Sequence, residues 1–340
     1  LLVVPCIGWG IAVQHTSTPY AVLMLLGLLA GFGGGNFSSF MPSSSLFFPK
    51  RLQGTALGIQ AGIGNFGVSV AQFVAPWVVG FALLGGVLGG SQTFVKDAVS
   101  KPIWLQNAFY VWVPFILLGA ALAWGFLRNV PVRATFLEQT DIFKEKHTWF
   151  MTSLYIMTFG SFSGFSAAFP LLIKQLYGRF DGAPDPLSYA YLGPLVGAAT
   201  RVVFGPIADR VGGAVVTQIS GIGLLACALG VTAYTAPTSV DQFTGFFWMM
   251  MGLFFFSGIG NASTFKQIPM IFPPRQAGGV IGWTSAIAAY GPFIFASIIG
   301  AVIAATGRPT AFFYGAAAFY LANIALNWWF YARRGAEKPC

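Results

Sequence analysis

The sequence predicts an all-α polytopic membrane protein, and three observations indicate this class. Only 8% of the 340 residues are charged and 56% are hydrophobic, whereas a soluble domain has about 25% charged residues. Long apolar segments alternate with short polar breaks along the whole chain. The 43 glycines and 16% aromatic residues suit closely packed spanning helices. A soluble enzyme is therefore excluded, and three dispersed cysteines also exclude a secreted disulfide scaffold.

Each apolar segment predicts one helix. A spanning helix needs about 20 mostly apolar residues. The first segment is short and begins without a Met or a positively charged start, so we expect a spanning helix cut at its edge rather than a signal peptide. The ten expected helices are Leu1–Gln14, Tyr20–Phe40, Thr55–Leu88, Trp104–Leu127, Trp149–Leu172, Leu187–Ala208, Ala214–Tyr234, Phe243–Thr264, Gly278–Ala305 and Ala311–Tyr331.

The basic residues alternate between the two sides of the membrane. Cytoplasmic loops are enriched in Lys and Arg, so the richer side is expected to be cytoplasmic and to include the C-terminus. The net charge of +9 then reflects membrane topology rather than nucleic-acid binding. The richer side holds Lys50, Arg51, Arg128, Arg133, Lys144, Lys146, Arg210, Lys266, Arg275, Arg333, Arg334 and Lys338, against Lys96, Lys101, Lys174, Arg179 and Arg308 on the other.

An eight-residue segment occurs twice in related form. Residues Gly33–Phe40 and Gly258–Phe265 are identical at five of eight positions, and each is followed by a proline and a basic cluster. The copies lie on the second and eighth expected helices, and some transporters consist of two parallel six-helix repeats. One helix precedes the first copy, whereas three precede the second copy within its half. We therefore expect about ten helices of a twelve-helix protein, with two N-terminal helices missing.

This repeat sets the expected domain organisation. Residues 1–127 are expected to be an N-terminal half that lacks its first two helices. Residues 128–148 are expected to be a cytoplasmic central loop, and residues 149–340 a C-terminal six-helix half.

Arg201 is the one charged residue well inside an expected span. All nine carboxylates and both histidines lie outside these spans or at their edges. No acid–base set or metal cluster is therefore expected in the membrane, which argues against an enzyme and against any cofactor or metal. An Arg near a helix centre costs about 2.5–3.5 kcal/mol, so Arg201 either extends to the membrane edge or faces a polar cavity. The lack of a buried acidic partner favours an anion site, because a planar guanidinium suits planar oxyanions.

Small and polar residues stand out on several of the other expected helices. Gly54, Gly58 and Gly62 recur every four residues, which predicts a smooth face for close helix contact. The polar residues that could line a pathway are sparse, and each could equally hold helices together. They are Asn36, Gln60, Asn65, Tyr155, Asn261 and Ser285.

Several segments resemble a known family. Residues 205–213, GPIADRVGG, are similar to the loop motif that major facilitator transporters carry after their second and eighth helices. Residues 54–67 resemble the first glycine-rich signature of the nitrate/nitrite porter family, and residues 282–291 resemble its second. Residues 155–166 resemble the seventh helix of that family. The resemblance implies a major facilitator fold of two six-helix halves.

The resemblance also implies roles for individual residues. Arg201 would be one of two arginines that grip nitrate, the other lying on a helix that this chain lacks. Tyr155 and Asn65 would hydrogen-bond the anion, Phe37 and Phe159 would enclose its flat faces, and Ser285 would line the pathway. Asp209 and Arg210 would form a cytoplasmic latch. The residues expected in gating and helix packing are these two with Gly54, Gly58, Gly62, Gly64, Gly67 and Gly282.

A transport mechanism follows as an expectation. Closing an empty cavity over an arginine is costly, because a buried charge needs a partner. We therefore expect alternating access in which the site closes only when loaded, giving nitrate/nitrite exchange. The alternatives are nitrate–proton symport and, from another class, an anion channel or sensor. The expected partners are nitrate, nitrite and the lipid bilayer, for a monomer in the bacterial inner membrane.

Overall fold

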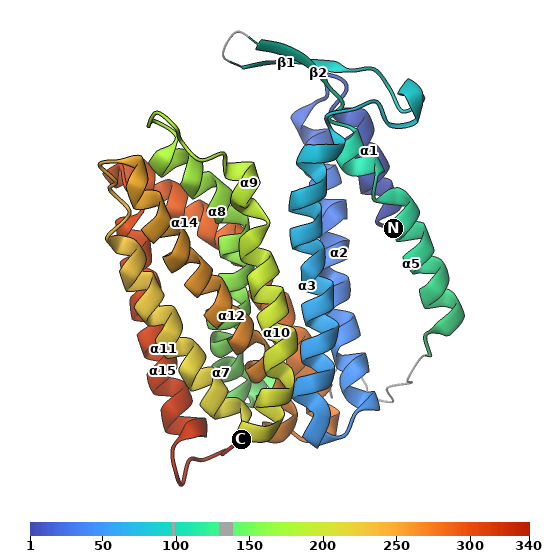
Figure 1. Ribbon diagram of the computed structural model, residues 1–340. Helices are drawn as coiled ribbons and strands as arrows, with labels where there is room; N and C mark the ends of the chain where they lie inside the picture. The colour runs from blue at the N-terminus through green and yellow to red at the C-terminus, as the bar shows by residue number, and fades with distance from the viewer. Residues whose placement is uncertain (97–98, 129–138) are drawn as a thin grey trace. The chain divides into compact units, whose positions relative to one another are not determined.

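The computed structural model describes residues 1–96, 99–128 and 139–340 (Figure 1). Arg133, Glu138 and most of the expected central loop lie outside the described residues, as does Asp97. The longer helices are α1 (Val3–Ala12), α2 (Tyr20–Phe47), α3 (Gln53–Val78), α5 (Val113–Phe126), α7 (Lys146–Tyr155), α8 (Ser161–Tyr177), α10 (Leu192–Val211), α11 (Gly213–Thr232), α12 (Phe243–Ile271), α13 (Pro274–Ala288), α14 (Gly291–Thr306) and α15 (Thr310–Asn327).

Shorter elements connect these helices. They are α4 (Asn107–Tyr110), α9 (Pro186–Ala190), the 3₁₀ turns η1 (Lys50–Leu52), η2 (Leu83–Gly86), η3 (Thr140–Lys144) and η5 (Val240–Gln242), and the π turns η4 (Ile156–Gly160) and η6 (Trp328–Ala332).

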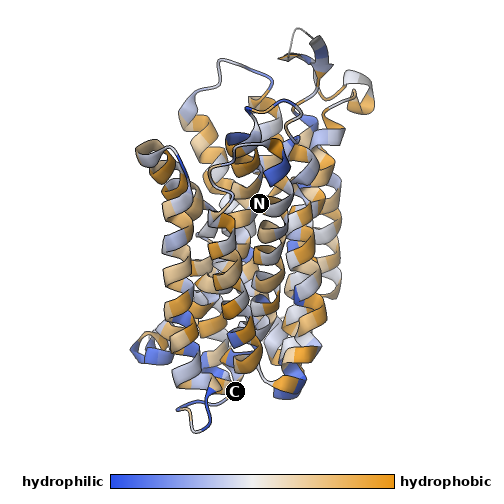
Figure 2. Cartoon of the chain, turned by 60° about the vertical axis from the view of Figure 1, so that its left-hand side comes forward, coloured by the Kyte–Doolittle hydropathy of each residue, from blue (hydrophilic) through white to orange (hydrophobic). Residues whose placement is uncertain are grey.

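The expected class is confirmed. Each of the ten expected segments contains a helix, and eight helical stretches among the described residues are long and apolar enough to cross a bilayer. Hydrophobic residues predominate along the helices, whereas hydrophilic residues gather at their ends (Figure 2). The chain is therefore a multi-pass helical membrane protein.

The largest difference from the expectation lies in the third expected helix, Thr55–Leu88. The third helix ends at Val78 rather than continuing to Leu88, shortly after Pro76. Strands β1 (Gln92–Lys96) and β2 (Val99–Ile103) follow and pair antiparallel, with Gln92 opposite Ile103. The two strands are rich in polar and β-branched residues, which suits a short hairpin outside the apolar spans.

The described chain forms two compact units. The first contains residues 1–36 and 71–133, and the second contains residues 37–70 and 134–340. In the first unit, Trp9 stacks on Phe109 with ring centroids 5.7 Å apart. Asn107 Nδ2 donates to the carbonyls of Val78 and Phe81 at 3.3 and 2.8 Å, which anchors α4 to the end of α3.

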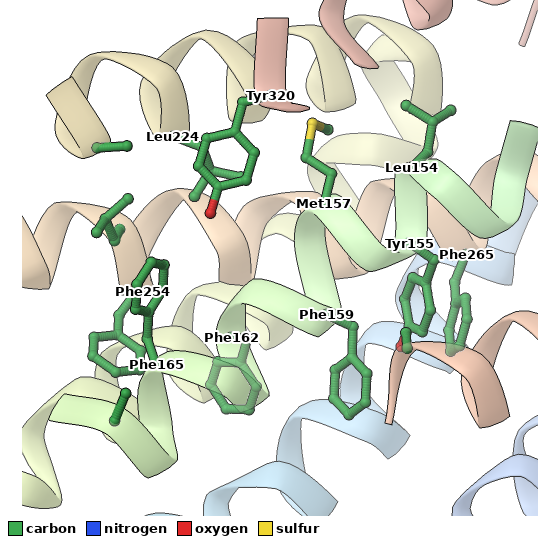
Figure 3. Packing of buried hydrophobic residues seen from close by; sticks show 14 of the residues in the cluster. Leu154, Tyr155, Met157, Phe159, Phe162, Phe165, Leu224, Phe254, Phe265 and Tyr320 are labelled. Atoms are coloured by element: carbon green, nitrogen blue, oxygen red, sulfur yellow. The ribbon is translucent and has the colours of Figure 1, made fainter. Parts of the chain in front are cut away.

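An aromatic cluster forms the core of the second unit (Figure 3). Phe162 on α8 meets Phe254 on α12 edge to face, with centroids 6.3 Å apart. A Cβ atom at Gly197 on α10 would lie 2.6 Å from the Phe162 ring, so this position has room only for glycine. Such glycines allow large rings and helix backbones to pack closely in a membrane.

The π turn η4 interrupts the long helix formed by α7 and α8. It spans Ile156–Gly160, and the proline within α8, Pro170, lies further along the chain. A π turn widens the helix locally and often occurs at functional sites. Here it begins directly after Tyr155 and contains Phe159, two of the residues expected to bind an anion.

Candidate anion-binding site

Arg201 is fully buried on α10, with 0% of its surface exposed. Its Nη2 donates to the hydroxyl oxygen of Tyr155 at 3.2 Å. Within the described part of the chain, its Nε and Nη1 have no hydrogen-bond partner. Among the described residues, four ion pairs occur and none includes Arg201. The guanidinium therefore keeps donors available in a buried environment.

Aromatic rings surround the guanidinium. Its central carbon lies 5.1 Å from the ring centroid of Phe265 and 5.9 Å from those of Phe37 and Phe159. Ring faces carry partial negative charge, so they attract the cation without neutralising it. This cage holds Arg201 in position and leaves its charge uncompensated.

Tyr155 continues the same cluster. Its ring stacks between Phe265, at 4.3 Å between centroids, and Phe159, at 5.3 Å (Figure 3). Its hydroxyl accepts from Arg201, so its own proton stays available for donation to a ligand. The structure thus brings together four of the residues expected to bind an anion, which are Arg201 on α10, Tyr155 on α7, Phe37 on α2 and Phe159 on η4.

The two phenylalanines expected to enclose an anion stack directly on each other. Phe37 and Phe159 have centroids 5.3 Å apart and an interplanar angle of 10°. A planar anion between two rings needs about 7 Å, twice a van der Waals contact of about 3.5 Å. The rings must separate before an anion can lie between them.

Asn65 and Ser285 are buried, but no described hydrogen bond joins them to Arg201. Asn65 on α3 is 7% exposed, and its Nδ2 has no hydrogen-bond partner in the part of the chain that the structure describes. Ser285 on α13 donates from Oγ to the carbonyl of Ile281 at 2.6 Å. Asn65 therefore has a free donor, whereas the hydroxyl proton of Ser285 is occupied within its own helix.

The sequence did not single out Phe265 as a site residue. Phe265 lies nearer to the guanidinium than Phe37 or Phe159 and also stacks on Tyr155. One signal was available, because Phe265 is the last residue of the repeated segment Gly258–Phe265. Among 35 phenylalanines that signal was too weak to identify it.

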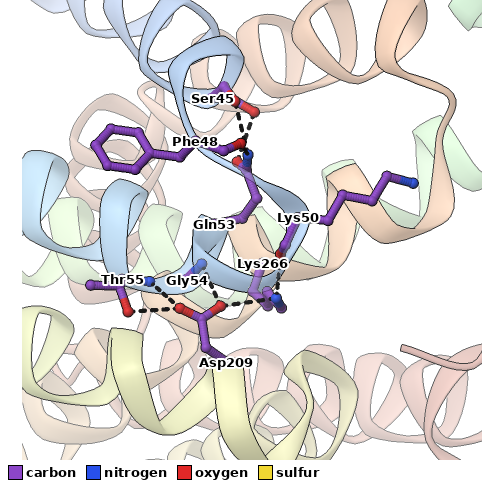
Figure 4. Close-up of polar contacts among 8 residues, drawn as sticks. All are labelled: Ser45, Phe48, Lys50, Gln53, Gly54, Thr55, Asp209 and Lys266. Atoms are coloured by element: carbon purple, nitrogen blue, oxygen red, sulfur yellow. Dashed lines mark hydrogen bonds and ion pairs between the residues drawn. The ribbon is translucent and has the colours of Figure 1, made fainter.

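A second buried charge, Asp209, lies at the end of α10 and is fully paired (Figure 4). Its Oδ1 accepts from the backbone N–H of Gly54 at 2.8 Å and pairs with Lys266 Nζ at 2.9 Å. Its Oδ2 accepts from the backbone N–H and the hydroxyl of Thr55, both at 2.7 Å. The carboxylate thus binds the N-terminal turn of α3, where backbone donors and the helix dipole favour an anion.

Two basic residues near Asp209, Lys266 and Arg210, differ in whether they take part in this contact. Lys266 Nζ also donates to the carbonyl of Lys50 at 2.6 Å, so it ties α12 to the segment before α3. Arg210, which the sequence grouped with Asp209, is exposed.

The glycine stripe of α3 packs against α10. A Cβ atom at Gly54 would lie 2.6 Å from the carbonyl oxygen of Gly205, and one at Gly58 would lie 3.1 Å from that of Arg201. At Gly62 the carbonyl oxygen of Ala198 would lie 3.0 Å away. At Gly54 only glycine allows this contact, because the obstructing atom belongs to the backbone, and at Gly58 and Gly62 any side chain would crowd the backbone of α10.

The other glycines of the predicted set have looser surroundings. A Cβ atom at Gly64 or Gly67 would meet no described atom within 4 Å. One at Gly282 would make ordinary contacts with Ser38 and Pro42 on α2, at 3.4 and 3.7 Å.

Comparison with known proteins gives the family. Residues 1–241 match the model of the Major Facilitator Superfamily. The chain is 69% identical to the probable nitrate/nitrite antiporter NarK2 of Thermus thermophilus, over 100% of this chain and 77% of that protein. It belongs to the nitrate/nitrite porter family of the major facilitator superfamily. This family consists of membrane transporters rather than enzymes.

A second sequence relative supports the same family, and two solved structures support the same fold. The nitrate/nitrite transporter NarU of Escherichia coli is 37% identical over 98% of this chain and 76% of its own length. The outward-facing transporter FucP has the same fold, with a TM-score of 0.68 at 14% identity over 96% of this chain and 80% of that chain. The human organic anion transporter MFSD10 aligns with a TM-score of 0.63 at 14% identity over 96% of this chain and 76% of its own. The predicted major facilitator fold is confirmed.

Proposed function

We propose that this protein transports nitrate across the bacterial inner membrane in exchange for nitrite, and that Arg201 binds the anion. The names of its relatives support the substrates, since the Thermus protein is called a probable nitrate/nitrite antiporter and NarU a nitrate/nitrite transporter. The proposed topology has a cytoplasmic C-terminus, and the protein acts as a monomer.

One observation carries the proposal: Arg201 is fully buried, and two of its three guanidinium nitrogens have no partner among the residues that the structure describes. An unpaired buried charge costs several kcal/mol. A bound monoanion offsets that cost by supplying charge and hydrogen-bond acceptors. The site is therefore more stable when loaded than when empty and closed.

The surroundings of Arg201 suit a small planar oxyanion. The guanidinium offers paired donors in one plane, which match two oxygens of nitrate or nitrite. The Tyr155 hydroxyl and the free Nδ2 of Asn65 add donors, and the flat rings of Phe37 and Phe159 match a planar ligand once they separate. Large or strongly hydrated anions fit an aromatic cage poorly.

Alternating access follows from this arrangement. The halves 1–127 and 149–340 move around the central anion, while contacts such as Asp209 with the first turn of α3 hold one of the two states. The empty site resists closure because Arg201 would remain unpaired. Each half-cycle then needs a bound anion, and exchange results.

The test of the anion site is a binding titration on the purified protein. Nitrate is titrated by isothermal calorimetry into the wild type, Arg201→Lys and the matched control Arg179→Lys, whose arginine donates to the Pro237 carbonyl outside the spans. We expect Arg201→Lys to weaken nitrate binding about 10- to 100-fold, because lysine cannot reproduce the planar paired donors. Equal affinity in Arg201→Lys and wild type contradicts the assigned site.

A further inference from the structure

Asn261 is a further buried polar residue whose side-chain atoms have no hydrogen-bond partner among the described residues. It lies on α12 with 0% of its surface exposed, and neither its Nδ2 nor its Oδ1 bonds to any residue in the described ranges 1–96, 99–128 and 139–340. Leaving a buried polar group unpaired is unfavourable, and such groups are rare in native proteins. A leucine would fill the same volume without that cost. The asparagine is therefore explained better by a ligand than by packing.

Helix periodicity directs Asn261 toward the anion site. Gly258, three residues earlier, packs against Gly197 on α10, where its Cβ would lie 2.9 Å from the Gly197 Cα. Phe265, four residues later, lies 5.1 Å from the Arg201 guanidinium. Residues three and four apart share one face of a helix, so Asn261 lies on the face that meets α10 near Arg201.

A contact on the neighbouring face of α12 further restricts the direction of the Asn261 side chain. Thr264 Oγ1 lies 3.4 Å from Thr158 Oγ1, so this side of α12 meets the π turn η4. Asn261 lies between that side and the side facing α10. Its amide therefore points into the angle between α10 and η4, where Arg201, Tyr155 and Phe159 converge.

We infer that Asn261 is a binding residue that donates from Nδ2 to the bound anion and selects nitrate over nitrite. This inference rests on the proposed function of the Arg201 site. The guanidinium pairs with two oxygens, which both anions possess. Nitrate has a third oxygen and nitrite does not, so a donor directed at that third oxygen, in addition to Tyr155 and Asn65, favours nitrate. Asn261 supplies that donor, because its Nδ2 has no other partner among the described residues.

A matched control is available in the same half. Asn327 on α15 is equally buried, but its Nδ2 donates to the carbonyl of Ala214 at 2.9 Å and to Gln218 Oε1 at 2.7 Å. Asn327→Leu removes bonds that hold helices together. Asn261→Leu removes none that the structure describes. The two variants therefore separate a ligand role from a structural role.

The experiment measures the dissociation constants of nitrate and nitrite by calorimetry, and the melting temperature without anion, for the wild type, Asn261→Leu and Asn327→Leu. We expect Asn261→Leu to bind nitrate about tenfold more weakly and nitrite at most about threefold more weakly, with an unchanged or higher melting temperature. Asn327→Leu should melt lower and keep the wild-type ratio of the two dissociation constants.

Two results overturn the inference. One is a nitrate affinity in Asn261→Leu equal to that of the wild type, and the other is an equal loss of affinity for both anions. If Arg201→Lys still weakens nitrate binding in either case, the proposed function stands and only the role of Asn261 fails. If the wild type binds neither anion, both fail together.

Discussion

Two buried charged side chains on α10, Arg201 near its middle and Asp209 near its C-terminal end, differ in how they are paired. Asp209 is satisfied by a lysine, a hydroxyl and two backbone amides, whereas Arg201 has a single described hydrogen bond, to a tyrosine. A buried charge that is paired within the protein stabilises one conformation, whereas a buried charge without a counter-charge is a candidate ligand-binding site. Both lie on α10, which links the anion site to the contact with α3.

The first prediction concerns the pair Asp209 and Lys266. Asp209→Asn leaves Lys266 buried without a counter-charge, which costs about 3–5 kcal/mol for a buried pair. We expect a lower melting temperature in detergent. The double variant Asp209→Asn with Lys266→Met should recover part of the loss, because removing both charges costs less than removing one. A double variant that melts below Asp209→Asn would contradict a direct pairing.

At the level of helices, the contact between α3 and α10 depends on the absence of side chains. A Cβ atom at Gly205 would lie 2.5 Å from the Gly54 carbonyl oxygen and 3.3 Å from the Thr55 Cα. Both obstacles are backbone atoms that cannot turn aside. The helices must therefore separate to accept even one methyl group, and Asp209 would then lose its bonds to the first turn of α3.

The second prediction follows from this contact. Gly205→Ala should lower the melting temperature, with overpacking worth about 1–3 kcal/mol. The control is Gly300→Ala on α14, where a Cβ would meet no described atom within 4 Å. That variant should be neutral or stabilising by about 0.5–1 kcal/mol, because alanine favours the helix. Equal effects of the two variants would show that the close contact is absent.

The third prediction concerns the segment after η6, which Glu337 ties to α7. Its carboxylate pairs with Lys146 Nζ at 2.7 Å and lies 3.1 Å from His147 Nε2. The hydrogen bonds from Lys146 and His147 lower the pKa of Glu337 below its ordinary 4.5. A lowered pKa stabilises the folded state above pH 4.5, and the contribution is lost as the pH falls through the folded-state value.

Melting temperatures measured between pH 7 and pH 3 check this contribution. Glu337→Gln should melt below the wild type at pH 7, and the difference should vanish at the acidic end. The control is Glu145→Gln, which changes an exposed glutamate with no described side-chain partner. A wild-type advantage that grows toward low pH would reverse the sign and contradict the pairing.

The sequence predicted the helices well because hydropathy alone determines which segments can span a bilayer. It did not predict the β1–β2 hairpin or the π turn η4, since neither follows from a run of apolar residues. The hairpin depends on local strand pairing, and the π turn depends on packing around Tyr155.

The sequence likewise predicted some residues of the candidate site and missed others. Arg201 was identifiable because an arginine within a span is costly, and Tyr155 and the two phenylalanines followed from family resemblance. The close contact of Phe265 and the missing partners of Asn261 depend on how α12 faces α10 and η4. A linear sequence does not specify those faces.

At the scale of the whole molecule, the central claim is that this porter closes only when its arginine site is loaded. Exchange needs anion on both sides of the membrane, whereas symport needs a proton gradient and a channel needs neither. The three mechanisms therefore differ in what must be present inside a vesicle for uptake to occur.

The measurement that separates them is uptake of labelled nitrate into proteoliposomes that contain nitrite, or no permeant anion, each with and without an inward proton gradient. Obligatory exchange predicts rapid uptake only with internal nitrite, no response to the proton gradient alone, and strongly reduced uptake in Arg201→Lys. Uptake into vesicles without internal nitrite, whether driven by protons or by the nitrate gradient alone, would contradict the account.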